Sequence, residues 1–105
     1  MIKLITDKQE ASYESTGSSF KGYIYTTYDK LVKAIGEPTF DEPSGDEKTQ
    51  VEWVIDFKGD FFTIYDWKTY DRDYTLNDLD RFNIGGKEQA FDFIEHLEKL
   101  IKSNK

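Results

Sequence analysis

The sequence predicts an α+β domain in which an antiparallel sheet of four or five strands packs against two helices. Two strand-like runs flank Lys58-Gly59-Asp60, two other segments carry apolar residues at helical spacing, and no stretch is apolar for the length of a membrane helix. A chain of 105 residues is one domain by size. We therefore assign residues 1–105 to a single domain, with residues 1–17 either part of it or a loosely attached arm.

Composition narrows the classes of partner. Acidic residues outnumber basic ones by 21 to 14, which gives a formal net charge of −7. This charge opposes direct binding to nucleic acid, and it suits either a basic protein partner or simple solubility. The chain has no cysteine, so disulfides and thiolate metal sites are excluded. The apolar run at the N-terminus is too short for a signal peptide, so we expect a cytoplasmic protein without a membrane partner.

The N-terminal third is expected to supply two strands. Residues 2–6 have the composition of an edge strand, and residues 7–19 that of a loop or a weak helical turn that ends before Gly17. Residues 19–26 alternate in polarity, which is typical of a half-buried strand. The alternation places three residues on one side of this strand: Phe20, Gly22 and Ile24.

A short helix is expected to follow, capped by Thr26 or Thr27 and reaching Ile35. Gly36 is suited to end it in a left-handed conformation, and the proline two residues later prevents its continuation. Residues 37–48 hold both prolines and several acids, so we expect a loop there.

A hairpin is expected where residues 49–57 and 61–67 flank the central turn. Glycine suits the first central position of a type II′ turn, so we predict the turn at Gly59-Asp60. This register pairs Phe57 with Phe62, Ile55 with Ile64, and Trp53 with Asp66. It separates an apolar face from a second face of acids and aromatics, which is either covered by a helix or exposed. The apolar face holds Trp53, Ile55, Phe57, Phe62 and Ile64, and the second face holds Glu52, Val54, Asp56, Lys58, Phe61, Thr63, Tyr65 and Trp67.

The C-terminal part predicts a polar loop over residues 68–80, a strand over 81–84 and a helix over 87–102. Residues 75–78 resemble a capping box that could start one helical turn in the loop. Gly85-Gly86 predicts a tight turn. The last helix carries an apolar stripe of Ala90, Phe93, Ile94, Leu97, Leu100 and Ile101.

Few residues suggest catalysis or metal binding, so we expect a protein that is not an enzyme and needs no cofactor or metal. The single histidine, His96, falls on the polar side of the last helix, where we expect it to face solvent. Asp71 and Asp73 begin like a calcium loop, but Leu76 and Phe82 stand where the loop needs glycine and glutamate.

Asp66 and a pair of glycines each allow more than one role. Asp66 on the apolar face must either lie at the rim of the sheet or be hydrogen-bonded, as a cap on backbone amides or to the Trp53 indole. Gly85, Gly86 and Lys87 precede a helix and could, as an alternative to a simple turn, expose amides to a phosphate.

Several motifs carry a family resemblance over about residues 20–97. They are EWxIxF at 52–57, TIYDWK at 63–68 and IGG at 84–86, together with Thr27-Tyr28, Leu31-Val32, Gly36-x-Pro38 and Gly45-Asp46-x-Lys48-Thr49. In these motifs the chain resembles a family of small proteins encoded in tailed-phage genomes. Relatives have Trp-His before Ile-Gly-Gly, where this chain has Phe82-Asn83, so no role of that histidine is carried over. The resemblance implies a phage protein that acts in the cytoplasm of its bacterial host.

The leading hypothesis is a binding protein that inhibits a host defence factor by occupancy, as an anti-CRISPR protein does. Such a protein needs rigid aromatic anchors and acids that match a basic, nucleic-acid-binding surface. One alternative is a sponge for a signalling nucleotide that uses aromatic stacking together with Gly85, Gly86 and Lys87. Another is a minor structural or assembly protein, including a homodimer. The expected anchors are Tyr65, Trp67, Tyr70 and Tyr74, and the expected charges are Asp56, Asp66, Asp71 and Asp73.

Overall fold

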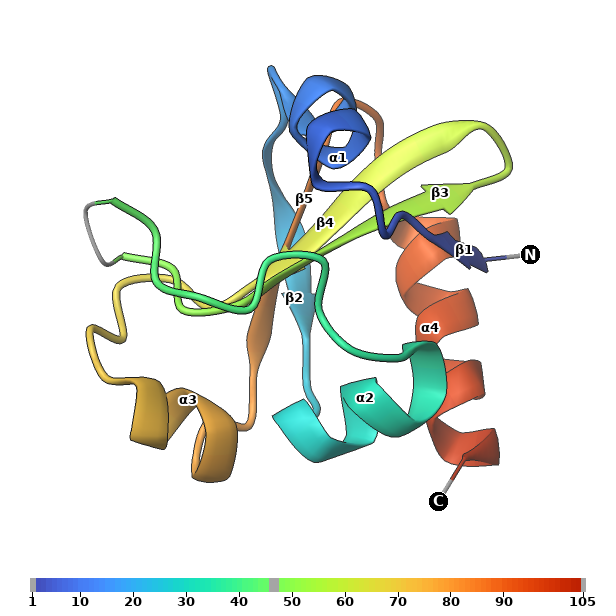
Figure 1. The fold of residues 1–105 in the computed structure, drawn as a ribbon. Coiled ribbons are helices and arrows are strands. Elements are labelled where there is room, and N and C mark those ends of the chain that lie inside the picture. Colours follow the sequence, from blue (N-terminus) through green and yellow to red (C-terminus); the bar gives the residue numbers. More distant parts are fainter. Residues whose placement is uncertain (1, 46–47, 105) are drawn as a thin grey trace.

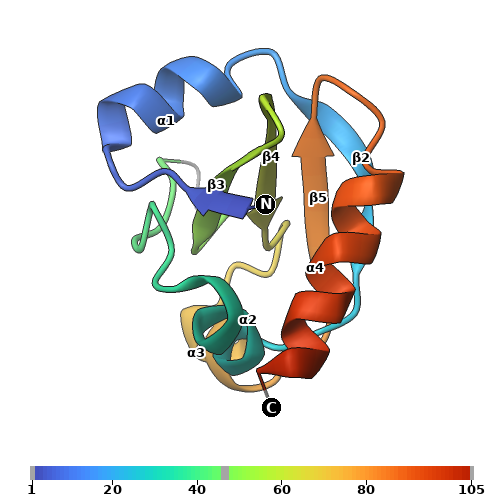
Figure 2. The same ribbon diagram turned by 90° about the vertical axis from the view of Figure 1, so that its right-hand side faces the viewer.

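The computed structural model describes residues 2–45 and 48–104, which form a five-stranded antiparallel sheet and four helices (Figure 1). The strand order is β1-β3-β4-β5-β2, and helices α2 and α4 lie together on one side of the sheet (Figure 2). The α+β prediction is confirmed. The elements are β1 Ile2–Leu4, α1 Lys8–Ser15, β2 Ser19–Ile24, α2 Tyr28–Ile35, β3 Glu52–Phe57, β4 Asp60–Tyr65, α3 Arg72–Asn77, β5 Phe82–Gly86 and α4 Phe91–Ser103.

The main core lies between the sheet and the pair of helices α2 and α4. Leu31 of α2 and Leu97 of α4 are fully buried against the strands, and the rings of Phe62 and Phe93 stack at 4.6 Å between centroids. The apolar face predicted for the hairpin is confirmed, because all five of its residues are buried. Within the described residues, no helix is both long and apolar enough to cross a bilayer.

Helices α1 and α2 begin directly after residues whose side chains cap them. The Thr27 hydroxyl accepts from the Lys30 amide at 3.3 Å, and Gly36 ends α2 with a φ of 104°. Helix α1 is a two-turn helix rather than a loop, since the Asp7 carboxylate caps it by accepting from two amides. Helix α4 begins at Phe91, four residues later than predicted.

The hairpin turn differs from the prediction. Lys58 and Gly59 form the two-residue loop, with φ of 56° and 91°, and positive φ at both positions is what a type I′ turn requires. Phe57 therefore pairs with Asp60, and Ile55 pairs with Phe62. The predicted register was wrong by two residues. A shift of two leaves every side chain on its own face, so the division into two faces survived the error.

A β-bulge in β2 overturns one predicted face. Phe20 pairs with Gly85 and Gly22 pairs with Ile84, so Lys21 is the extra residue of the bulge. Because of this extra residue, Phe20 moves to the second face of the sheet, beside Tyr23. The prediction that Phe20 shares a side with Gly22 and Ile24 was wrong.

Gly85 and Gly86 belong to strand β5 and do not form a turn. They pair with residues of β4 on one side and of β2 on the other. A Cβ atom at Gly85 would lie 2.7 Å from Thr63 Oγ1, and one at Gly86 would lie 2.8 Å from the Phe62 ring. The glycines therefore serve close packing within the sheet. The two glycines are separated from the start of α4 at Phe91, so the alternative of an anion site at Gly85, Gly86 and Lys87 does not form at a helix N-terminus.

Replacing Gly85 by alanine is expected to lower the free energy of unfolding by about 1–3 kcal/mol, because the methyl group must displace the Thr63 side chain in a well-packed sheet. Gly45→Ala is the control, since nothing lies within 4 Å of a Cβ there. Urea unfolding of both variants measures the difference. Equal stability of the two variants would contradict the packing explanation.

Candidate functional site

The second face of the sheet is divided into a covered half and an open half. Helix α1 covers the half around Val54, where Ala11 and Ile5 are buried against it and Phe40 and Phe61 close the edges. Figure 1 shows α1 above one end of the sheet, with α3 at the opposite end. The open half therefore lies beyond α1, over β5, β2 and the end of β4.

Four aromatic side chains, which we call the aromatic patch, lie on this open half: Phe20, Tyr23, Tyr65 and Trp67. The rings of Phe20 and Tyr23 meet edge to face at 4.9 Å between centroids, and those of Tyr65 and Trp67 at 6.1 Å. Trp67 is 49% exposed. Burial raises the pKa of the Tyr65 phenol, and a hydrogen bond with Asn83 partly offsets this effect. The patch is held by the sheet and is open to a partner.

Cations of the chain itself already lie over these rings. The Arg81 guanidinium is 4.1 Å from the centroid of the Tyr23 ring. The Nζ atoms of Lys48 and Lys68 are 5.7 and 5.8 Å from the Trp67 ring. Such contacts are favourable because a cation is attracted to the negative face of an aromatic ring. The patch therefore has the chemistry to receive basic side chains.

A cavity of about 310 Å³ lies between the patch and the end of α1, and we call it the Glu52 cavity. Glu52 lies beside Phe20, Tyr65 and Trp67 there, and serines of α1 and of the following turn complete the wall. Burial, with a smaller contribution from the charge of Asp66, raises the pKa of the Glu52 carboxyl to about 7. The carboxyl is thus close to half ionised at neutral pH.

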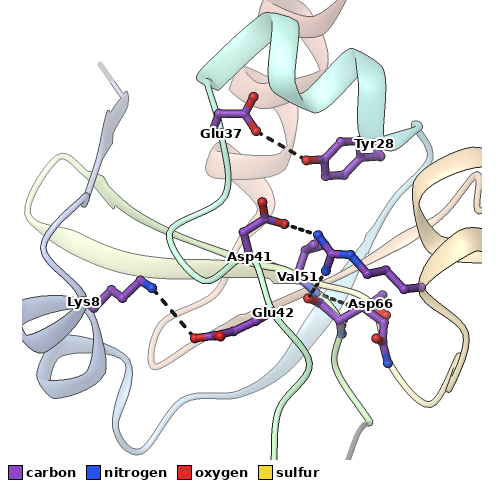
Figure 3. Close-up of polar contacts among 9 residues, drawn as sticks. Lys8, Tyr28, Glu37, Asp41, Glu42, Val51 and Asp66 are labelled. Atoms are coloured by element: carbon purple, nitrogen blue, oxygen red, sulfur yellow. Dashed lines mark hydrogen bonds and ion pairs between the residues drawn. The ribbon is translucent and has the colours of Figure 1, made fainter.

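Asp66 is a buried carboxylate just after β4 that accepts four hydrogen bonds. It is 1% exposed, and its Oδ1 accepts from the amides of Gln50 and Val51 at 2.7 and 3.0 Å (Figure 3). Its Oδ2 accepts from the hydroxyls of Thr69 and Thr75 at 2.7 and 2.9 Å. The expected cap on backbone amides is confirmed. The Trp53 indole, the other partner considered, donates to the Gly36 carbonyl instead.

The four hydrogen bonds to Asp66, which we call the Asp66 network, lie beneath the loop that carries Trp67 and Tyr70. Lys68 and Tyr70 have φ of 57° and 54°, a left-handed conformation that costs energy in residues other than glycine. The hydrogen bond from Thr69 to Asp66 and the one from the Lys68 amide to the Lys48 carbonyl, at 2.7 Å, hold the loop in this shape. The positions of these exposed rings therefore depend on a buried carboxylate.

The remaining expected contact residues lie around α3 and at the hairpin. Asp71 caps α3 by accepting from the Tyr74 amide, so α3 starts three residues before the predicted capping box at Thr75, which is itself buried. Tyr70 and Tyr74 are exposed, as is Asp73. Asp56 lies on the second face near the hairpin turn, where it accepts from the Gly59 amide.

The structure brings together only two of the expected anchors, Tyr65 and Trp67, on the open half of the sheet. Asp66 is buried with both oxygens in use, so its expected role as a surface charge was wrong. His96 is half-buried, with its ring 5.3 Å from the Phe57 ring, and does not simply face solvent.

The sequence did not predict three residues of the site as contact residues: Phe20, Tyr23 and Glu52. A bulge leaves no clear mark in sequence, which explains Phe20, whereas Tyr23 lies opposite Gly22 and Ile24 as the alternation predicts. Glu52 did leave a signal, because it is an acid within a strand of buried residues.

Within the described residues, no group of three or more His, Cys, Asp or Glu side chains is arranged to hold a metal ion. Comparison with protein-family models, with curated proteins and with solved structures gives no match to this chain.

Proposed function

We propose that this chain is a phage accessory protein that binds a protein of the bacterial host and inhibits it by occupancy, in the manner of an anti-CRISPR protein. The aromatic patch is the observation that carries the proposal. Exposed tyrosine and tryptophan side chains on a rigid sheet are typical of the centre of a protein interface. The net charge of −7 favours a partner with a basic surface, such as a nucleic-acid-binding defence factor in the host cytoplasm.

The alternatives have less support. A nucleotide sponge would use aromatic stacking together with the glycines before the last helix. The aromatic patch could supply the stacking, but these glycines are paired within the sheet, and the net charge of −7 opposes an anionic ligand. Self-association through the patch, as in an assembly protein, would use the same aromatic rings, so the test must separate a host partner from a second copy of the chain.

Replacing Trp67 and Tyr70 together by alanine is expected to abolish capture of the host partner, because both are exposed anchors presented by the same loop. The measurement is native mass spectrometry of tagged protein recovered from host lysate at moderate salt. Phe91→Ala is the matched control, since Phe91 is an exposed aromatic on α4, in the other layer of the molecule. Melting curves check that both variants are folded.

Three outcomes would contradict the proposal. The double variant could retain the host protein while folded, the Phe91 variant could lose it as well, or the unmodified chain could be recovered only as a homodimer. Expression of the chain in a bacterium that restricts a phage provides the functional readout. We expect phage plating to rise with the unmodified chain and not with the double variant.

A further inference from the structure

The Glu52 cavity is lined by both aromatic rings and a carboxyl group. Aromatic rings of Phe20, Tyr65 and Trp67 line one part of it, and the half-buried Glu52 carboxyl lines another. Of the residues that line this cavity in the described part of the chain, none is basic. The lining therefore offers a negative charge and aromatic rings, while Lys48 and Lys68, which are not part of the lining, lie over the Trp67 ring at 5.7 and 5.8 Å.

One polar group of the cavity is buried without a partner. The Ser18 hydroxyl has no hydrogen-bond partner within the described residues. In the same cavity, burial and, to a smaller extent, the charge of Asp66 raise the pKa of the half-buried Glu52 carboxyl, because both disfavour its ionised form. A buried polar group without a partner and a desolvated carboxylate are both unfavourable, so both groups would gain from a cationic ligand that forms hydrogen bonds.

Arginine is the side chain that fits these walls best. Its planar guanidinium donates two parallel hydrogen bonds to a carboxylate and stacks on aromatic rings, whereas a lysine ammonium is a more strongly hydrated point charge. The chain provides its own example beside the cavity, where the Arg81 guanidinium lies 4.1 Å from the Tyr23 ring.

We infer that the Glu52 cavity is a socket for one arginine side chain of the protein partner, with the guanidinium paired to Glu52 and held between Phe20 and Trp67. This inference rests on the proposed function, since it names the partner chemistry at the same surface. It adds a specific requirement, which is an exposed arginine on the partner.

The charges around Glu52 set a pH dependence. Tyr65 of β4 and Asp66, which follows that strand, interact electrostatically with Glu52, and Glu42 lines the adjoining cavity of about 400 Å³. Helix α1 contributes serines, and Lys48 and Lys68 lie over the Trp67 ring. Arginine pairs with the ionised carboxylate, so binding must release a proton whenever Glu52 starts protonated. We expect affinity to be about tenfold higher at about pH 8 than at about pH 6.

The test uses the isolated protein and a capped Gly-Arg-Gly tripeptide, with Gly-citrulline-Gly and Gly-Lys-Gly as matched peptides. Amide NMR shifts at millimolar peptide measure binding, and calorimetry in two buffers of different ionisation enthalpy measures proton release. We expect saturable shifts at Glu52, at Ser18 and at the Trp67 indole with the arginine peptide. We expect at least tenfold weaker binding of the citrulline peptide.

The variant Glu52→Gln should lose both the affinity and the proton release, while Glu98→Gln, an exposed glutamate on α4, should behave as the unmodified chain. The inference is overturned if the arginine peptide gives no saturable shift, if the citrulline or lysine peptide binds equally well, or if Glu52→Gln binds with the same pH dependence. If the arginine peptide binds but no host protein is recovered, the arginine site is supported and only the inhibitor function is contradicted.

Discussion

Replacing Asp66 by alanine is expected to lower the free energy of unfolding by about 3–5 kcal/mol, the largest single effect we anticipate. The variant removes an acceptor that four groups use. In the unmodified chain the buried amides of Gln50 and Val51 and the hydroxyls of Thr69 and Thr75 donate hydrogen bonds to this carboxylate. The two threonine hydroxyls can still bond to each other, since they lie 2.8 Å apart, so most of the loss is expected from the buried amides and from the space left by the carboxylate. Because a single domain has about 5–15 kcal/mol of stability in total, this loss is expected to leave the chain close to unfolding at 37 °C.

Two comparisons make the Asp66 prediction specific. Asp73→Ala removes an exposed aspartate from α3 and should change stability by less than about 0.5 kcal/mol. Asp66→Asn keeps an acceptor for the two amides and should cost less than Asp66→Ala, since the threonine hydroxyls can rotate to accept from the new amide. Urea unfolding monitored by Trp fluorescence measures all three variants. An Asp66→Ala loss within about 1 kcal/mol of that for Asp73→Ala would contradict the role of the network.

Glu52→Gln is expected to stabilise the protein by an amount that grows as the pH rises from 4.5 to about 7 and is constant above that. Burial raises the pKa of Glu52 to about 7 in the folded chain, above its ordinary value of 4.5. Because the folded state holds the Glu52 proton more tightly than the unfolded state, Glu52 contributes stability that is fully present below pH 4.5. This stability is lost as the pH rises through 7. Between these values the folded state binds the proton and the unfolded state does not. The difference corresponds to about 3 kcal/mol of stability at about pH 8, which the glutamine variant retains.

The measurement is the free energy of unfolding of both chains from about pH 4 to about pH 8, where the difference between them isolates the titration of Glu52. We expect the two chains to agree at the acid end and to diverge towards pH 8, with the glutamine variant more stable. The free energy of unfolding of Glu98→Gln should depend on pH in the same way as that of the unmodified chain. A constant difference between Glu52→Gln and the unmodified chain across this range would show that Glu52 titrates normally.

These two carboxylates are coupled, which gives a further readout of the same site. The charge of Asp66 contributes to the raised pKa of Glu52, so Asp66→Asn should move the Glu52 titration to lower pH if the variant remains folded. Asp66, the buried acid beneath the loop of Trp67, thereby also contributes to the proton affinity of Glu52, although burial is the larger cause.

Local patterns in the sequence were enough to determine the fold class and the core. Helical spacing identified α2 and the stripe of α4, the capping residues Thr27 and Gly36 marked where α2 begins and ends, and alternation separated the two faces of the hairpin. These features depend on residues that are near one another along the chain. The prediction of the faces survived even the register error, because a shift of two residues does not move a side chain to the opposite face.

The tertiary structure alone decided the site, because its features depend on residues distant in sequence. The bulge at Lys21 brings Phe20 to the aromatic patch, and the close approach of Thr63 and Phe62 explains why Gly85 and Gly86 stand in a strand. Coverage by α1 determines which half of the second face is open. Burial within this arrangement gives two acids of the same region opposite roles. Asp66 accepts from four donors and is structural, whereas Glu52 lines the cavity and burial raises the pKa of its carboxyl.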